Sequence, residues 1–255
     1  MLNTINNLIM LVKAKLNIKF NSAKKIKKNF RKTLHQLTLE DRFTKIHEIN
    51  YWGSNESISG VGSTLALTAN LRKHLPILFK KYHIKRVFDG PCGDFHWMQH
   101  VVNETNIDYT GGDIVLPLIE ANQTKYANEH VKFKKIDLTT DELPNADLMI
   151  CRDCLFHLSY YDTKKLLSNF VKSNIPYFLT TTYLNKNRFN NKDIVTGNFR
   201  EIDLFSTPYN FPKDALYQID DWIAPESPRF MCLWTRAQVI IALETFESNK
   251  ILRLA

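Results

Sequence analysis

The pattern that most constrains the fold is an alternation, from residue 75 onward, of short apolar runs with helix-like segments. This rhythm is typical of βαβ units, whose strands lie parallel in one sheet and whose helices cover its faces. It predicts strands over residues 85–90, 108–114, 131–138, 146–153, 176–183 and 229–235, with helices over 95–104, 115–127, 160–173 and 236–246. We therefore expect an α/β protein with a mostly parallel central sheet flanked by helices.

The length and composition fit one domain with an appendage. The chain has 255 residues, of which 44% are hydrophobic and 24% charged, and these are ordinary proportions for a globular protein. The alternation is absent from the N-terminal segment. We expect an arm over residues 1–45 and a single domain over residues 46–255.

The net charge of +8 is concentrated in the arm. Residues 1–39 hold nine Lys or Arg and no acid, which leaves 25 basic against 26 acidic residues in the remainder. A protein that binds nucleic acid needs a basic surface on the domain that makes the contact. The near-neutral body therefore argues against nucleic acid as the main partner.

Apolar residues in the arm recur at helical spacing with lysines between and after them. They are Leu2, Ile5, Leu8, Ile9, Val12 and Leu16. The pattern fits a helical basic arm that contacts anionic lipid peripherally through residues 1–32. A helix docked on the body or on a partner fits equally well. The apolar run is too short for a membrane span, and no signal-peptide features accompany it.

Four scattered cysteines argue against a disulfide framework and for a reducing cytoplasm, at most with the arm at the inner face of a membrane. Cys151 and Cys154 form a CxxC, but no second pair or histidine pair completes a zinc site. We expect packing at a strand end and no metal.

The segment "VFDGPCGDFHWM" (87–98) runs from a strand through a glycine-rich turn towards a helix. Such a turn can bring backbone N–H groups close to a nucleotide-like ligand. Asp113 ends the next strand, where a carboxylate can accept hydrogen bonds from a ribose. However, the spacing of "GPCGD" does not suit a pyrophosphate, and Asp89 and Asp94 would repel one. The acids favour a cofactor that presents a cation.

S-adenosylmethionine carries an ammonium and a sulfonium, and the segment resembles the glycine-rich motif of class I S-adenosylmethionine-dependent methyltransferases. The resemblance extends over roughly residues 50–235 to a bacterial group with SGxGS and DxPCGD elements. It is carried by "SISGVGSTLALTANLRKHLP", "CRDCLFHLSYYD" and "GNFREIDLFSTPYNFP". It implies a Rossmann-like methyltransferase fold and an enzyme that uses S-adenosyl-L-methionine.

The resemblance also implies the cofactor site. The turn would surround the methionine part, Asp113 would hold the ribose, and Asp137 with Leu138 would flank the adenine. Arg72 is a candidate for the cofactor carboxylate, with a surface ion pair as its alternative. The expected set is Arg72, Asp89, Gly90, Cys92, Gly93, Asp94, Trp97, Asp113, Ile114, Asp137, Leu138 and Arg152. A strand-end aspartate can instead cap a helix or form a turn, and Trp97 can instead pack in the core.

The fourth predicted strand ends in Arg152 and Asp153, with His157 one turn later. Ligands of open α/β sheets bind beyond the carboxyl ends of the strands. A histidine is the natural base for an acceptor hydroxyl. We expect His157 to be the base and Asp153 to orient it or to replace it; a buried His157 with only a packing role is the alternative.

For the acceptor, the sequence offers Ser59 and Ser63 in "SGVGS" together with Arg200 and Tyr209 in an irregular C-terminal segment. The serine segment suits an anion, although Ser63 can act as a helix cap alone. Arg200 suits a phosphate or carboxylate, and Asn198 and Phe199 would join it in a lid. We expect O-methylation of a small polar acceptor, such as a sugar or phosphorylated precursor in capsule or surface-polysaccharide synthesis.

Three other functions remain open from the sequence. The lysine-rich arm could tether an RNA or other nucleic-acid methyltransferase. The chain could be a non-catalytic, membrane-associated scaffold with a vestigial site. A dinucleotide-dependent oxidoreductase shares the strand–turn–helix arrangement, but the turn lacks its GxGxxG spacing.

Overall fold

A computed structural model of the chain describes residues 26–185 and 189–248. The chain divides into two compact units, residues 1–38 and 39–255, and each is described by itself. Helix α2 (Leu39–Glu48) belongs to the larger unit, so the expected boundary after residue 45 falls inside this helix.

The smaller unit is helical where it is described. Residues 26–33 form an α-helix, and a 3₁₀ turn, η1 (Leu34–Gln36), follows. The amphipathic pattern from Leu2 to Leu16 lies outside the described residues, so lipid contact by residues 1–32 remains a prediction. Of the described helices, none combines the length and apolarity that crossing a bilayer requires.

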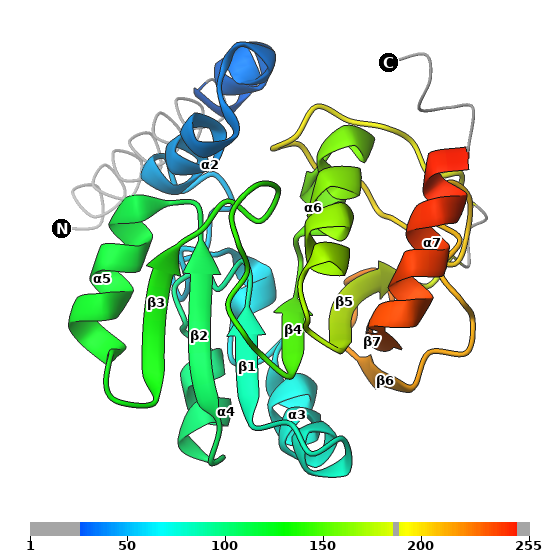
Figure 1. Cartoon of the computed structure of the whole chain (residues 1–255). Helices are drawn as coiled ribbons and strands as arrows, with labels where there is room; N and C mark the ends of the chain where they lie inside the picture. The colour runs from blue at the N-terminus through cyan, green and yellow to red at the C-terminus, as the bar shows by residue number, and fades with distance from the viewer. Residues whose placement is uncertain (1–25, 186–188, 249–255) are drawn as a thin grey trace, which may run out of the picture. The chain divides into compact units, whose positions relative to one another are not determined.

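The larger unit is built on a seven-stranded sheet in the order β3-β2-β1-β4-β5-β7-β6 (Figure 1). Its strands are β1 (Arg86–Asp89), β2 (Asp108–Asp113), β3 (Val131–Lys135), β4 (Leu148–Cys151), β5 (Tyr177–Tyr183), β6 (Tyr217–Asp220) and β7 (Arg229–Thr235). Strands β1 to β5 pair in parallel, whereas β7 is antiparallel to both β5 and β6. The mostly parallel sheet expected from the alternation is confirmed.

Helices cover both faces of the sheet. Their bounds are α3 (Ala69–Lys81), α4 (Met98–Asn103), α5 (Leu116–Tyr126), α6 (Tyr160–Lys172) and α7 (Arg236–Ser248). Apolar residues of α3, α4 and α5 join one buried cluster, and those of α6 and α7 join the other. The described residues also include two short 3₁₀ turns in this unit, η2 (Val61–Ser63) and η3 (Leu155–His157).

The side chains of β1, β4 and β5 are almost all buried, as strands covered on both faces require, whereas the edge strand β3 has exposed lysines. Leu148, Met149, Ile150 and Cys151 are all buried in β4. Strand β6 was missed because it is a four-residue edge strand with one buried side chain, Ile219, and so gives little sequence signal.

Two predicted strands extend two or three residues beyond the observed carboxyl ends. β3 ends at Lys135 rather than at residue 138, and β4 ends at Cys151 rather than at residue 153. Asp137, Arg152 and Asp153 are therefore outside the strand pairing and lie just beyond the carboxyl ends of β3 and β4. This is the edge of the sheet at which a side chain can face a ligand.

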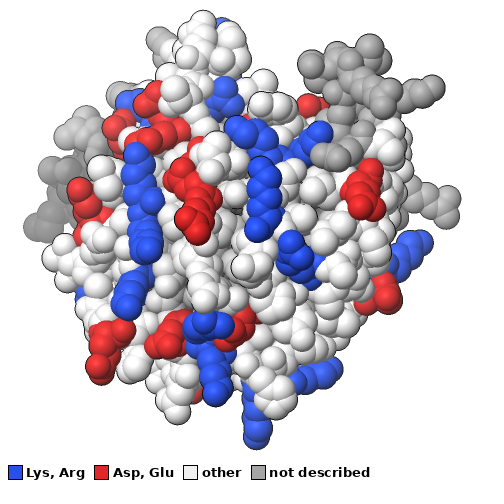
Figure 2. All heavy atoms as spheres, in the orientation of Figure 1, with Lys and Arg blue, Asp and Glu red and all other residues white. Residues whose placement is uncertain are grey.

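Charges of both signs are interspersed on the face shown in Figure 2. This distribution agrees with the balance of 25 basic and 26 acidic residues over positions 40–255. Within the described residues, no group of three or more His, Cys, Asp or Glu is arranged to hold a metal ion.

Candidate active site

A cavity lies at the carboxyl ends of β1 to β4, with about 1090 Å³ of empty space including its open mouth. This is the edge of the sheet at which α/β proteins bind ligands. Thirteen of the predicted site residues line it: Ser59, Ser63, Asp89, Cys92, Gly93, Trp97, Asp113, Ile114, Asp137, Leu138, Arg152, Asp153 and His157. Five others, Arg72, Gly90, Asp94, Arg200 and Tyr209, do not belong to its lining.

Asp89, the last residue of β1, places a buried carboxylate in the cavity. The Tyr109 hydroxyl donates to its Oδ2 at 2.8 Å, and the described residues form no other hydrogen bond to this carboxylate. Burial raises the pKa of Asp89 to about 7, although the Tyr109 bond and the Arg152 charge oppose the shift. A carboxylate in this state gains stability from a bound cation.

Asp113, the last residue of β2, is held differently. Its Oδ1 accepts the Val115 N–H at 3.0 Å and its Oδ2 accepts the Gly93 N–H at 3.2 Å. Burial raises the pKa of Asp113 to about 6, and the backbone N–H donors limit the rise. Each oxygen keeps a lone pair for a ligand hydroxyl.

Asp137 lies two residues beyond β3 and also lines the cavity. Its Oδ1 accepts both the backbone N–H and the hydroxyl of Thr139, at 2.8 and 2.7 Å. These bonds shape the turn that presents Leu138 to the cavity. The three aspartates therefore follow three adjacent strands, as the sequence predicted.

The glycine-rich turn lets another part of the chain approach closely. Gly93 has a φ of +56°, and a Cβ there would overlap the Ser59 side chain. The Ser59 hydroxyl accepts the Asp94 N–H at 2.9 Å. A glycine at position 93 is therefore required by the approach of the "SGVGS" segment.

Asp94 serves this packing, Gly90 packs against Leu138 and Phe88 instead, and both lie outside the lining. The Asp94 carboxylate accepts the Ile58 N–H at 3.0 Å and the Ser57 hydroxyl at 3.0 Å. A Cβ on Gly90 would come within 2.7 Å of Leu138. Arg72 donates to the Leu65 carbonyl at 3.0 Å. The cofactor contacts expected of these three residues thus stay untested predictions.

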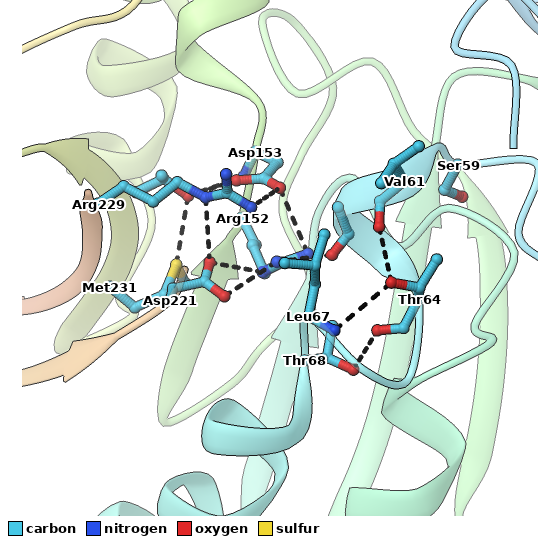
Figure 3. Close-up of polar contacts among 12 residues, drawn as sticks. Ser59, Val61, Thr64, Leu67, Thr68, Arg152, Asp153, Asp221, Arg229 and Met231 are labelled. Atoms are coloured by element: carbon cyan, nitrogen blue, oxygen red, sulfur yellow. Dashed lines mark hydrogen bonds and ion pairs between the residues drawn. The ribbon is translucent and has the colours of Figure 1, made fainter. Parts of the chain in front are cut away.

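Four charged side chains form a cluster beyond β4 and the β6–β7 hairpin (Figure 3). Arg152 donates to both carboxylate oxygens of Asp221, at 2.9 and 3.0 Å, and to the Gly62 carbonyl at 2.8 Å. Arg229 lies 3.5 Å from Asp153 and 3.7 Å from Asp221. We call these four residues, Arg152, Asp153, Asp221 and Arg229, the ionic cluster. Its two positive and two negative charges balance.

The ionic cluster fixes the "SGVGS" segment. A Cβ on Gly62 would come within 2.8 Å of the Asp153 carboxylate. The Arg152 guanidinium also lies over the Trp97 ring, 5.4 Å from its centroid. Sequence reasoning missed Asp221 and Arg229, because only the folded hairpin brings them to β4.

His157 lies in η3, and its Nδ1 is 2.8 Å from the Asn198 carbonyl. A carbonyl only accepts, so Nδ1 carries the proton and the neutral ring has its lone pair on Nε2. Nε2 has no hydrogen-bond partner among the described residues. Burial lowers the pKa of His157 below the ordinary 6.5, although the Asn198 bond and Asp153 oppose the shift.

Asp153 does not form the hydrogen bond to His157 that the sequence led us to expect. Its carboxylate accepts the Thr181 hydroxyl at 3.2 Å and pairs with both arginines. Burial favours its neutral form, but the two guanidinium charges outweigh burial and lower the pKa of Asp153. The group that orients His157 is a backbone carbonyl, which residue type could not reveal.

Arg200 and Tyr209 bind each other rather than the cavity. Arg200 donates to the Tyr209 hydroxyl at 2.7 Å and to the Leu158 carbonyl at 2.6 Å. Tyr209 is 1% exposed. The pair ties the C-terminal segment to the end of η3, and the acceptor contacts expected of both residues stay predictions. Phe199, in contrast, is 55% exposed, and its ring lies 5.9 Å from His157.

Helix α2 and the turn after it supply site residues that sequence reasoning assigned to the arm or overlooked. Leu39, Phe43 and His47 line the cavity. Their spacing of four residues places them on one helix face, a signal visible in "LEDRFTKIH". Trp52 also lines the cavity, and its ring centroid is 5.4 Å from that of His157.

Comparisons with solved structures agree with the fold. A SAM-dependent methyltransferase from Leishmania major superposes with a TM-score of 0.59 and 15% identity, over 82% of this chain and 91% of that one. Human N-acetylserotonin methyltransferase, in complex with SAM, gives a TM-score of 0.56 and 14% identity, over 80% of this chain and 61% of that one. Mitomycin 7-O-methyltransferase MmcR gives a TM-score of 0.55 and 13% identity, over 81% of this chain and 60% of that one.

No protein-family model matches the chain, and no curated protein matches it in sequence. The chain spans about three fifths of the length of two of these structural neighbours. At such identities the likeness concerns the fold, and it defines the class: the larger unit has the Rossmann-like methyltransferase fold.

Proposed function

We propose that the protein is an S-adenosylmethionine-dependent methyltransferase. The observation that carries the proposal is the row of Asp89, Asp113 and Asp137 along one cavity at the ends of three adjacent strands. The fold shared with SAM-dependent methyltransferases supports it.

The donor set of the cavity fits this cofactor. Asp89 is a buried carboxylate with a raised pKa and one hydrogen bond, so an ammonium beside it would stabilise the ionised form. Asp113 has spare acceptor capacity for ribose hydroxyls. Ile114, Leu118 and Leu138 offer apolar surface for a purine. Phosphate would be repelled by the same acids, which argues against a dinucleotide.

When bound, the cofactor supplies an electrophilic methyl group on a sulfonium. The work of the chain is to hold the acceptor, exclude water and remove its proton. His157 suits the last task because its Nε2 carries a lone pair at neutral pH. The Asn198 carbonyl keeps this tautomer in place.

For the acceptor, the sequence favoured a sugar or phosphorylated precursor in surface-glycan synthesis, processed in the cytoplasm or at the inner face of a membrane. Methylation at oxygen fits the base assigned to His157. The anion contact expected of Arg200 is the weak part of this interpretation, because its guanidinium is already bonded to Tyr209 and Leu158.

Isothermal titration of the full chain with S-adenosylmethionine and with its demethylated product tests the proposal. We expect one saturable site, weakened by Asp89→Asn and unchanged by Asp108→Asn, which alters an exposed carboxylate. Absence of binding by both compounds at pH 8 would remove the proposal.

A further inference from the structure

Helix α2 and Trp52 cross the carboxyl edge of the sheet from β3 to beyond β4. Glu40 forms an ion pair of 2.7 Å with Lys135, the last residue of β3. Trp52 contacts the ring of His157, which follows β4. Residues 39–52 therefore cover the cavity (Figure 1 shows α2 above the ends of β2 and β3). Gly60 supports this cover, since a Cβ there would lie 3.0 Å from the Trp52 Cβ.

The part of the cavity around His157 is apolar and aromatic. Trp52 lines it beside His157. The rings of Phe156 and Phe199 lie 4.6 and 5.9 Å from the His157 ring but outside the described lining, and Phe199 is half-exposed to solvent. The remaining lining not assigned to the cofactor includes Leu39, Phe43, Cys154, Leu158 and Leu166. An acceptor that reaches Nε2 must lie against these surfaces.

The same part of the cavity has little to offer a charged or polyhydroxylated acceptor. Among the described lining residues, the basic side chains are Arg152, His47 and His157, and Arg152 is already bonded to Asp221. The described lining contains no Asn or Gln, and its polar side chains outside the three strand-end aspartates include Ser59, Ser63, Thr139 and Asp153. Asp153 is paired with two arginines, and Ser59 and Thr139 are bonded to Asp94 and Asp137. A sugar would therefore bury several hydroxyls without partners.

Resting on the function proposed above, we propose that the acceptor is a flat aromatic compound with a ring hydroxyl, which stacks on Trp52 and directs the hydroxyl at His157 Nε2. Aromatic rings gain from offset or edge contacts with other rings beyond the area they bury. The Trp52 indole, which lines the cavity beside His157, provides such a contact.

Methyl transfer to the acceptor hydroxyl involves His157 and the methyl group of the cofactor. The hydroxyl proton moves to Nε2 of His157 and an oxygen lone pair forms the bond to the methyl carbon. The carbon–sulfur bond breaks with its electron pair remaining on sulfur. The products are an aryl methyl ether, a neutral thioether and a protonated His157, which returns its proton to water.

The first experiment measures acceptor binding with the cofactor site filled by S-adenosylhomocysteine. We expect 2-naphthol to bind in this ternary arrangement, and methyl glucoside and glucose 1-phosphate to bind at least ~10-fold more weakly. With S-adenosylmethionine present, 2-naphthol should yield its methyl ether, detected by mass spectrometry. Tighter binding or faster methylation of either sugar would overturn the proposal.

Variants of Trp52 distinguish a loss of stacking from a defect in folding. Trp52→Ala should weaken the binding of 2-naphthol at least ~10-fold and leave the affinity for S-adenosylhomocysteine unchanged. Trp52→Phe should keep most of the affinity for 2-naphthol. Trp222→Phe is the matched control, because Trp222 does not line the cavity. If Trp52→Ala keeps full naphthol affinity, or if Trp52→Phe loses as much as Trp52→Ala, Trp52 is not the stacking platform.

Failure of this inference and failure of the proposed function have different signatures. Cofactor binding without any naphthol binding or methylation rejects the aromatic acceptor and leaves the methyltransferase assignment standing. Absence of cofactor binding rejects both. Cofactor binding with turnover of a sugar returns the acceptor to the class favoured by the sequence.

Discussion

The carboxylates that end β1 and β2 and those that follow β4 and β6 are buried in different surroundings. Asp89 and Asp113 line the cavity, burial raises the pKa of each, and no cation of the described residues forms an ion pair with either. Asp153 and Asp221 instead pair with Arg152 and Arg229 in the ionic cluster. There the two guanidinium charges outweigh burial and lower the pKa of Asp153, whereas burial still raises the pKa of Asp221. The difference supports the ligand role proposed for Asp89 and Asp113 and a structural role for the paired charges.

Replacing the proposed base should have the largest effect. His157→Asn keeps a donor for the Asn198 carbonyl but lacks the lone pair of Nε2, so kcat/KM should fall by ~10²–10⁴ with cofactor affinity unchanged. With the cofactor saturating, the kcat of the unmodified enzyme should decline at low pH with an apparent pKa below 6.5, since burial lowers the pKa of His157. His100→Asn, outside the lining, is the control; equal losses in both variants would contradict the assignment.

Removing one member of the ionic cluster should damage the fold. Asp221→Asn leaves Arg152 and Arg229 buried with a single carboxylate between them, and we expect a loss of about 3–5 kcal/mol in the free energy of unfolding. Urea titration measures it. Asp220→Asn changes the exposed neighbour and should have little effect. A stable Asp221→Asn protein would show that the cluster is not structural.

Replacing Asp89 should instead stabilise the folded protein at neutral and higher pH. The pKa of Asp89 is raised from 3.8 to about 7 by folding, so the folded state binds more protons in this window and stability falls as pH rises through it. Asp89→Asn abolishes this loss. The variant should have a higher urea midpoint than the unmodified protein at pH 8, with the difference shrinking towards pH 5, while it binds the cofactor roughly 10- to 100-fold more weakly.

In the unmodified protein, the affinity for the cofactor should depend on the ionisation of Asp89. If the ammonium requires ionised Asp89, affinity at pH 5.5 should be on the order of 30-fold weaker than at pH 8. Protonation of Asp113, whose pKa is about 6, adds to the weakening. The pH dependence should be much reduced in Asp89→Asn, and an undiminished dependence there would assign it to another group.

The smallest effect concerns the contact between Gly62 and the ionic cluster. Gly62→Ala places a methyl group 2.8 Å from the Asp153 carboxylate, and overpacking of this kind costs about 1–3 kcal/mol. The midpoint of urea unfolding should fall modestly. Val61→Ala, at a residue that is 50% exposed, is the matched control and should be nearly neutral.

Sequence reasoning found the parts of the site that are local in the chain. The parallel strands and their order of appearance follow from apolar runs and turn residues, and Asp89, Asp113 and Asp137 follow strand ends that can be read directly. The pattern also placed His157 one turn after the fourth strand. These features depend on spacing within a few residues, which the sequence displays.

The tertiary structure decided what depends on contacts between distant segments. Asp94 is bonded by Ser57 and Ile58, Asp153 by two arginines, and Arg200 by Tyr209, so side chains of suitable chemistry are already occupied. Asp221, Arg229 and Trp52 reach the site only after the chain has folded. The sequence by itself determined which chemical groups stand at the strand ends. Only packing determined which of them remain unpaired, because a buried charge binds whichever partner the fold brings to it.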